Sequence, residues 1–333
     1  MRAVVATHGH CFDGLCSAVV FTRLLRELHA RELKGRDPTG REAKVPAVRF
    51  HYLSCGYSPN QRALGELLDG DVNAILDYRF CATERLDWYF DHHRTAFGSD
   101  ADQAFFEARR EARPYHYDAS YSSCTKLVRD VALARYDVAM ADLDPLTAWA
   151  DKIDSAAFES AEAALDYSNP VMQLVSVVEH HGDGELLARL VPRLLEAPVE
   201  EVAQRSEFRE LYRKIRRKKA AFAQRVRQNA RHNGRVVLVD LSEAELETYG
   251  KFVTYALYPD AMYSVIVGRF KNGARINVGY NPWSTHELDR DLSSICGRYG
   301  GGGHPFVGGI SFPAEDVHRA QNVAHEIARE LDG

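Results

Sequence analysis

The sequence predicts an α/β protein with two domains: an N-terminal domain with a mostly parallel sheet flanked by helices, a helical connector, and a smaller C-terminal α/β domain. Three observations support this prediction. Short apolar segments alternate with helical patterns near both ends of the chain. The stretch between them has a helical pattern throughout. The length of 333 residues exceeds that of an average single domain.

The predicted strands of the N-terminal part end at polar residues. Strands are expected at 2–7, 48–53, 73–76 and 88–90, and helices at 15–33, 121–136 and 146–158. In parallel sheets of this kind, ligands bind at the carboxyl ends of the strands. His8, Asp77 and Asp91 fall at those ends.

The remaining elements define the predicted connector and second domain. Residues 184–232 are predicted to be entirely helical, and 205–231 are strongly basic. Acidic and apolar residues are interspersed there, so a solvated connector is favoured over a nucleic-acid-binding surface. Strands follow at 236–241, 263–270, 275–280 and 307–312, with helices at 288–299 and 314–331. The predicted domains are 1–183, 184–232 and 233–333.

Composition excludes several classes of protein. The net charge of -5 gives no general attraction to nucleic acids or membranes. No segment reaches the ~20 apolar residues of a membrane span, and the N-terminus lacks the pattern of a signal peptide. The six cysteines form no CxxC pair, which favours reduced core residues. We therefore expect a cytoplasmic protein without a membrane partner.

Four short segments carry side chains that bind metals. They share carboxylate or imidazole groups at predicted strand or helix ends: the turn His8–Gly14, Asp77, Asp91-His92-His93, and Asp151. Such ligands suit manganese, cobalt, iron or zinc, and mixed sets often hold two ions. Taken singly, each is also typical of a turn residue, a cap or a surface charge. Together they favour a metal centre.

These motifs, in this order, resemble those of the DHH phosphoesterase superfamily, in the branch with the DHH-associated C-terminal domain. The triplet Asp91-His92-His93 gives the family its name, and the first motif is similar to its H-x-D-C-x-D-G. Asp77 and Asp151 correspond to the second and fourth motifs. The run Gly300-Gly301-Gly302-Gly303-His304 is similar to the GGGH signature of the C-terminal domain.

The resemblance implies two divalent ions, commonly manganese, and a role for each matching residue. His8, His10 and Asp77 would hold the first ion. The second would be held by Asp13, Asp77, His92 and Asp151. Asp91 would orient a neighbouring ligand, and His93 would contact the scissile phosphate or assist proton transfer. Hydroxide generated by the ion pair would attack phosphorus, while His93 and Arg94 offset charge on the phosphoryl oxygens.

Two positions depart from the family pattern. His10 stands where the family usually has Asp, which adds no negative charge to the site. The strand Asn277–Asn281 lacks the Arg-Ser pair that often grips the substrate. The glycine loop is predicted to bind substrate through Gly301, Gly302, Gly303 and His304, because glycine backbone lets N–H groups approach an anion.

The resulting hypothesis is a metal-dependent phosphoesterase acting on short oligonucleotides or small nucleotides. Candidates include nanoRNA, cyclic dinucleotides and 3′-phosphoadenosine nucleotides. Two alternatives stay open: hydrolysis of pyrophosphate or polyphosphate by the same metal pair, and a non-catalytic relative that binds nucleotides or nucleic acid. A homodimer stays open beside a monomer.

Overall fold

The computed structural model describes residues 1–36, 47–56, 64–247, 249–271 and 273–333. The chain forms two compact units. The first contains Met1–Ala157 and Gln173–Arg209, and the second contains Phe158–Met172 and Glu210–Gly333. One unit has a parallel sheet flanked by helices and the other a mixed sheet, which confirms the predicted α/β class with two domains.

The first unit is built on a parallel sheet in the order β2-β1-β3-β4-β5. Its strands are β1 (Arg2–His8), β2 (Arg49–Cys55), β3 (Val72–Leu76), β4 (Trp88–Asp91) and β5 (Tyr115–Tyr117). The middle of β1 is continuously buried, as expected for a strand covered on both faces. The apolar run of β1 therefore matches a strand in the interior of this sheet.

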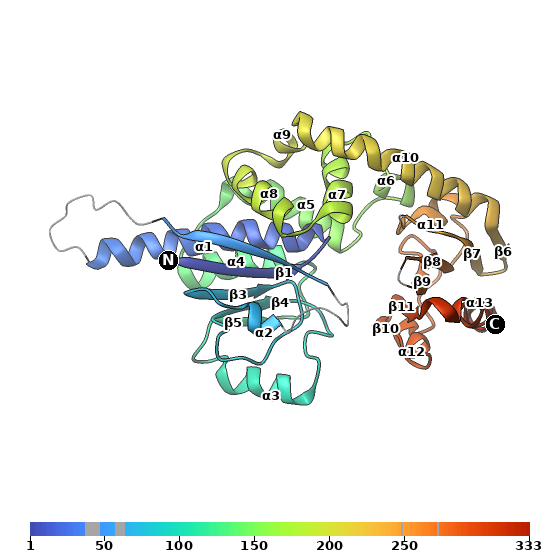
Figure 1. Cartoon of the computed structure of the whole chain (residues 1–333), viewed down its shortest axis with the longest axis horizontal. Helices are drawn as coiled ribbons and strands as arrows, with labels where there is room; N and C mark the ends of the chain where they lie inside the picture. The colour runs from blue at the N-terminus through green and yellow to red at the C-terminus, as the bar shows by residue number, and fades with distance from the viewer. Residues whose placement is uncertain (37–46, 57–63, 248, 272) are drawn as a thin grey trace. The chain divides into compact units, whose positions relative to one another are not determined.

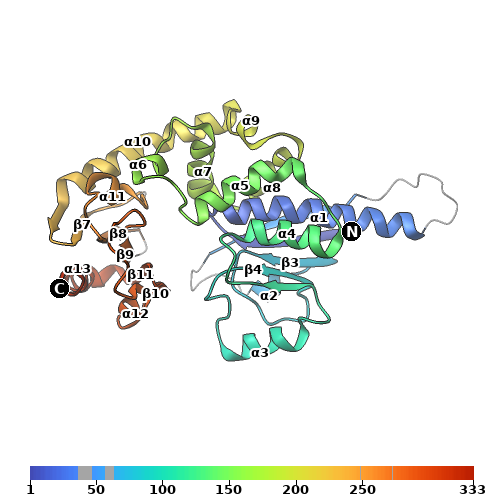
Figure 2. The same ribbon diagram turned by 180° about the vertical axis from the view of Figure 1, so that it is seen from behind.

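Helices cover both faces of this sheet (Figures 1 and 2). On one side lie α1 (Phe12–Arg36), α4 (Cys124–Tyr136), α5 (Asp144–Asp154) and α8 (Gly184–Glu196). On the other lie α2 (Leu64–Leu67) and α3 (Asp100–Arg109). The core on the second side includes Ile75, Tyr89 and Phe106, all fully buried. The remaining elements around this unit are η1 (Ala141–Leu143), α7 (Pro170–His181) and α9 (Val199–Ala203).

The stretch 184–232 is not a single helical run. It contains α8, α9 and α10 (Ser206–Asn229), followed by the strand β6 (Ala230–Asn233). Ala197 is extended (φ -145°, ψ 152°) because the following Pro198 disfavours helical backbone at the preceding residue. At the other end, Gly234 and Arg235 form the turn of an antiparallel hairpin, and Gly234 has φ 51°. The prediction that 184–232 are entirely helical was wrong at these points.

The second unit contains a mixed sheet in the order β10-β11-β9-β8-β7-β6. Beyond β6, its strands are β7 (Val236–Glu245), β8 (Tyr263–Phe270), β9 (Gly273–Tyr280), β10 (Gly302–His304) and β11 (Val307–Phe312). Strands β7 and β8 are parallel, and the other pairs are antiparallel. Its shorter helices are α6 (Ala161–Ala164), α11 (Val253–Leu257), α12 (Leu292–Gly297) and η2 (Ala314–Asp316), and the longest after α10 is α13 (Val317–Asp332).

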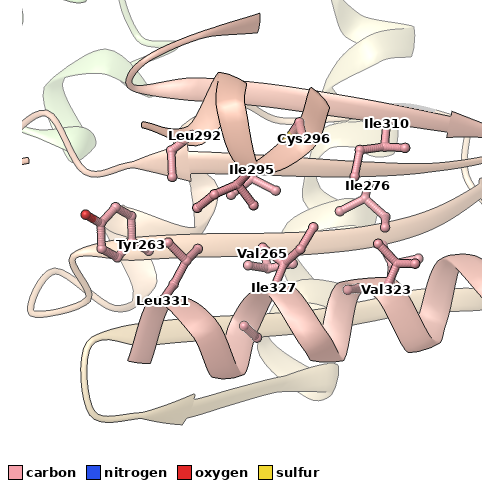
Figure 3. Close-up of a cluster of buried hydrophobic side chains, with 14 of the residues drawn as sticks. Tyr263, Val265, Ile276, Leu292, Ile295, Cys296, Ile310, Val323, Ile327 and Leu331 are labelled. Atoms are coloured by element: carbon pink, nitrogen blue, oxygen red, sulfur yellow. The ribbon is translucent and has the colours of Figure 1, made fainter. Parts of the chain in front are cut away.

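Two layers of apolar side chains hold the second unit together. Figure 3 shows Ile327 and Leu331 of α13 and Ile295 of α12 packed against Val265 and Ile276 of the sheet. The opposite face packs against α10 and α11. Burying several such side chains, at roughly 1.5–3 kcal/mol each, is the main source of stability.

The surface of α10 is basic. Its 24 residues include nine Lys or Arg and two Glu, while Phe208, Ile215 and Val226 are buried. This arrangement is an amphipathic helix with a solvated cationic face. Among the described helices, not one combines the length and apolar character that crossing a bilayer demands.

Candidate metal centre

The strand order explains why distant motifs meet. Strand β1 pairs with β3, and β3 pairs with β4, all in parallel. Their carboxyl ends therefore lie side by side, and they carry His8, Asp77 and the triplet from Asp91. The chain continues from β1 toward β2 on one side and from β3 toward β4 on the other, so this edge is the topological switch point where α/β sheets bind ligands.

Asp77 is at the centre of this edge and has an unusual backbone. It follows β3 with φ 52°, in the left-handed region that few residues other than glycine adopt. Its N–H donates to Phe90 O at 2.9 Å, which ties the ends of β3 and β4 together. The residue is 1% exposed, yet within the described residues neither carboxylate oxygen receives a hydrogen bond. A buried, unsatisfied carboxylate costs about 1–3 kcal/mol, and such strain typically occurs at functional sites.

The triplet arranges its two histidines through Asp91. Asp91 is fully buried and accepts hydrogen bonds from the Tyr89 hydroxyl, from the backbone of His92 and from His93 Nδ1 at 2.7 Å. His92 Nδ1 lies 3.0 Å from Tyr121 O, which fixes the tautomer with the proton on Nδ1. The Nε2 atom of His92 faces the carboxylates, 3.6 Å from Asp77 Oδ1 and 3.9 Å from Asp13 Oδ2.

Asp13 joins the first turn of α1 to the start of α4. Its carboxylate accepts hydrogen bonds from the backbone N–H groups of Cys124 and Thr125 and from the Thr125 hydroxyl. These N–H groups are at the positive end of α4, which stabilises a buried negative charge. Three bonds leave room for another partner, because a carboxylate has about four acceptor positions.

Gly14 allows α1 to begin against this edge. A Cβ at this position would come within 2.7 Å of His8 O and 3.3 Å of Asp77 Oδ2. Any larger residue would therefore displace the strand end or the carboxylate. The close approach of His8 and Asp77 therefore explains why glycine follows Asp13 in this motif.

The structure brings Asp154, rather than the predicted Asp151, next to the cluster. Asp154 Oδ2 lies 3.2 Å from His92 Nε2, and these two groups form a potential metal-binding set with Asp13. Asp151, one helical turn earlier in α5, accepts hydrogen bonds from Ser122 and Ser123 and pairs with Lys126 at 3.4 Å. Those partners hold Asp151 at the start of α4. Asp154 therefore replaces Asp151 as the candidate ligand.

The turn after β1 also differs from the predicted set of ligands. A His8 nitrogen, the Cys11 sulfur and an Asp77 carboxylate oxygen all lie within 4.8 Å of one another. His10 is exposed, has φ 58°, and belongs to none of the potential metal-binding groups of the described residues. The backbone N–H of His10 donates to Gly182 O at 3.1 Å, which fixes the turn in this conformation. Cys11 was not predicted as a ligand, because cysteines without a CxxC pair are typical of reduced core residues.

The electrostatics of the cluster favour positive charge. Burial and repulsion from Asp77 and Asp154 raise the pKa of Asp13 well above its usual range. Burial likewise raises the pKa of Asp77, opposed in part by His92. Burial alone would lower the pKa of His92, but Asp154, Asp77 and Asp13 outweigh it and raise the pKa to about 11. Several carboxylates so close together are stable only with protons or cations between them.

These residues fit the binding of divalent metal. The overlapping groups are His8–Cys11–Asp77, Asp77–His92–His93 and Asp13–His92–Asp154, and Asp77 and His92 are shared. The donors are carboxylate, imidazole and thiol, which suit divalent transition metals. Both oxygens of Asp77 are buried and receive no hydrogen bond from the described residues, so both are available to a cation. Arg94 is exposed at the margin of this edge.

Known structures share this architecture. The whole chain aligns with the whole of a pGpG-specific phosphodiesterase, PggH from Vibrio cholerae, at 20% identity and a TM-score of 0.62. It also aligns over 99% of its length with 87% of a DHH-domain chain described as belonging to a family of ribosomal proteins, at 14% identity and a TM-score of 0.59. The chain has the fold of DHH proteins.

A third similar structure is RecJ from Thermus thermophilus in complex with Mn²⁺. The alignment covers 98% of this chain and 52% of RecJ, at 12% identity and a TM-score of 0.57. No protein-family model matches the sequence, and no curated protein does. The resemblance inferred from the motifs is thus confirmed for the DHH fold.

In the second unit, packing explains most of the glycine loop. A Cβ on Gly301 would meet Gly309 O at 2.2 Å, and one on Gly303 (φ 146°) would meet Val307 O at 2.2 Å. Gly302 has open space, so packing does not require glycine there. His304 ends β10, and its ring stacks on Phe306 with centroids 5.6 Å apart. A substrate role for Gly301, Gly302, Gly303 and His304 stays a prediction, with Gly302 and His304 its strongest members.

Proposed function

We propose that this chain is a DHH-family hydrolase that uses two divalent metal ions, with Mn²⁺ the first choice, to cleave phosphate esters of short oligonucleotides or small nucleotides. The observation that carries the proposal is Asp77: a buried carboxylate at the switch point of a parallel sheet, whose oxygens receive no hydrogen bond from the described residues and whose Oδ1 lies 3.6–3.7 Å from nitrogens of the His92 and His93 rings. PggH acts on a dinucleotide and RecJ holds Mn²⁺, and both have this fold.

The proposed ligands come from four elements. Asp77 would bridge the ions. His8 would complete one side of the site, and Asp13, His92 and Asp154 the other. When bound, the two ions would supply Lewis acidity, which activates water near neutral pH and offsets charge on phosphoryl oxygens.

The remaining residues orient the reacting groups. The Asp91 carboxylate holds His93 by Nδ1 at 2.7 Å, so a contact between His93 and a phosphoryl oxygen would use Nε2. That nitrogen can donate a hydrogen bond to charge that develops in the transition state. The tie between His92 Nδ1 and Tyr121 O keeps His92 in the tautomer that binds a cation. Exposed Arg94 can add a further positive charge near the phosphate.

A panel of substrates tests this proposal. The protein would be incubated with Mn²⁺ and a linear dinucleotide, a cyclic dinucleotide, 3′-phosphoadenosine 5′-phosphate or pyrophosphate, alongside an Asp77→Asn control. We expect turnover of at least one nucleotide by the wild type and none by the control. Turnover of pyrophosphate alone would overturn the substrate class, and tight nucleotide binding without turnover would indicate a binding protein.

The glycine loop is tested separately. His304→Ala is expected to raise KM for the preferred nucleotide with little change in kcat, because it removes binding without touching the reacting atoms. An unchanged KM would remove the loop from the substrate site.

A further inference from the structure

The turn after β1 contains Cys11, and no thiol was among the metal ligands predicted from the sequence. Cys11 is partly buried, and its sulfur, a His8 nitrogen and an Asp77 oxygen lie within 4.8 Å of one another. The other two members are proposed ligands, and Asp77 has no hydrogen-bond partner among the described residues. Two independent features therefore point to a ligand position at this sulfur.

The surroundings distinguish Cys11 from the other cysteines. Four of these are buried, and none of the four belongs to a potential metal-binding group of the described residues: Cys16, Cys55, Cys124 and Cys296. Cys11 directly precedes the 25-residue helix α1, and its carbonyl accepts a hydrogen bond from Leu15 N–H. A helix N-terminus stabilises an anionic sulfur.

A divalent ion held by His8 and Asp77 would lie within reach of this sulfur. A bound ion favours the thiolate, because a coordinating thiol loses its proton outright.

Charge balance leads to the same conclusion. His10 occupies the position at which the family usually has Asp, and it is exposed and outside the cluster. Asp13, Asp77 and Asp154 supply three negative charges. A thiolate at Cys11 supplies a fourth, which matches the four positive charges of two divalent ions.

We propose that the Cys11 thiolate is a ligand of the ion held by His8 and Asp77, and that it shifts this position toward softer metals such as Zn²⁺, Co²⁺ or Fe²⁺. The inference rests on the metal site of the proposed function and refines its chemistry. The S–H proton passes to solvent as the metal–sulfur bond forms, and no electron is transferred. Thiolate ligands favour zinc and other soft ions, whereas Mg²⁺ prefers oxygen.

The geometry is compatible with one ion. Metal–sulfur bonds of about 2.3 Å and metal–nitrogen bonds of about 2.0–2.1 Å place the ligand atoms of a tetrahedral ion roughly 3.3–3.6 Å apart. The three atoms lie within 4.8 Å of one another, close to this spacing.

Cobalt provides a direct readout that does not depend on activity. The full-length wild type would be titrated with Co²⁺ and compared with Cys11→Ser, Cys11→Asp and the matched control Cys81→Ser. Bound cobalt would be counted by equilibrium dialysis, and thiolate ligation followed by its near-ultraviolet charge-transfer band. We expect the band in the wild type and in Cys81→Ser, and its loss in both Cys11 variants. Cys11→Asp should still bind the ion, with its preference for Co²⁺ over Mn²⁺ reduced about 10- to 100-fold.

A measurement without substitutions guards against misfolded variants. X-ray absorption of the zinc-loaded wild type should show a sulfur at about 2.3 Å. Cobalt or zinc bound without any sulfur signal, or a band that persists in Cys11→Ser, would overturn the role of Cys11 alone. Failure of the wild type to bind any ion would overturn the metal site of the proposed function as well.

Discussion

Replacing Asp77 with Asn should stabilise the metal-free protein while removing its response to metal. Asp77 is 1% exposed, and within the described chain neither of its oxygens has a hydrogen-bond partner. Asn is nearly the same size, tolerates the φ of 52° and carries no charge next to Asp13 and Asp154. We expect a gain of about 1–3 kcal/mol in the free energy of unfolding, because the substitution removes a buried charge whose repulsion from Asp13 and Asp154 is only partly offset by His92.

Asp91 provides the matched control. It is equally buried, but it accepts hydrogen bonds from Tyr89, His92 and His93. Asn at position 91 would replace an acceptor with a donor and leave at least one of these groups unpaired. Asp91→Asn should therefore lose about 1–3 kcal/mol. The two variants make the same chemical change and should have opposite effects.

The assay is urea unfolding with excess EDTA and again with Mn²⁺. An ion present at 100 times its Kd stabilises the wild type by about 2.7 kcal/mol. Asp77→Asn should lose most of this gain. The reasoning would be refuted if Asp77→Asn were less stable than the wild type in EDTA, or if it kept the full stabilisation by Mn²⁺.

Three further predictions concern neighbouring positions. Asp154→Asn should lower kcat/KM at least about 100-fold, while Asp151→Asn should cost no more than about tenfold; the reverse order in steady-state assays would restore Asp151 as the ligand. Gly14→Ala should weaken Mn²⁺ binding about 10- to 100-fold in calorimetry, because its Cβ would lie 3.3 Å from Asp77 Oδ2, and unchanged affinity would contradict that packing. Burial, with Arg135 and Arg110, lowers the pKa of His116 to about 4 in the folded protein. As the pH falls below about 6.5, His116 is protonated in the unfolded state but not in the folded state, so the free energy of unfolding decreases. His116→Phe should remove about 1–2 kcal/mol of the loss between pH 7 and pH 5, measured by urea unfolding, and an identical pH dependence would refute the assignment.

The sequence was sufficient to predict the central strands of the parallel sheet and the edge that carries the candidate metal site. Apolar runs at β1, β3 and β4 are followed directly by polar residues, and parallel pairing brings their carboxyl ends together. Strand β5 is only three residues long, too short for a reliable apolar pattern. The helical prediction for 230–232 failed because strand pairing with β7 overrides local preference.

The site residues differ in how far sequence could identify them. Asp151 and Asp154 are one turn apart on α5, so spacing alone does not decide between them. The choice depends on Ser122 and Lys126, which contact Asp151 from another part of the chain. Cys11 was missed for a related reason. The backbone of the turn, with its left-handed residue at position 10, decides which neighbouring side chain faces Asp77, and the order of residues does not reveal that backbone.

Anomalous diffraction from crystals grown with Mn²⁺ tests the metal centre most directly. Two peaks flanking the Asp77 carboxylate, one near His8 and one near His92 and Asp154, are the predicted result. A map without a peak beside Asp77, in crystals where that edge of the sheet is ordered, would contradict the assignment of this chain as a two-metal phosphoesterase.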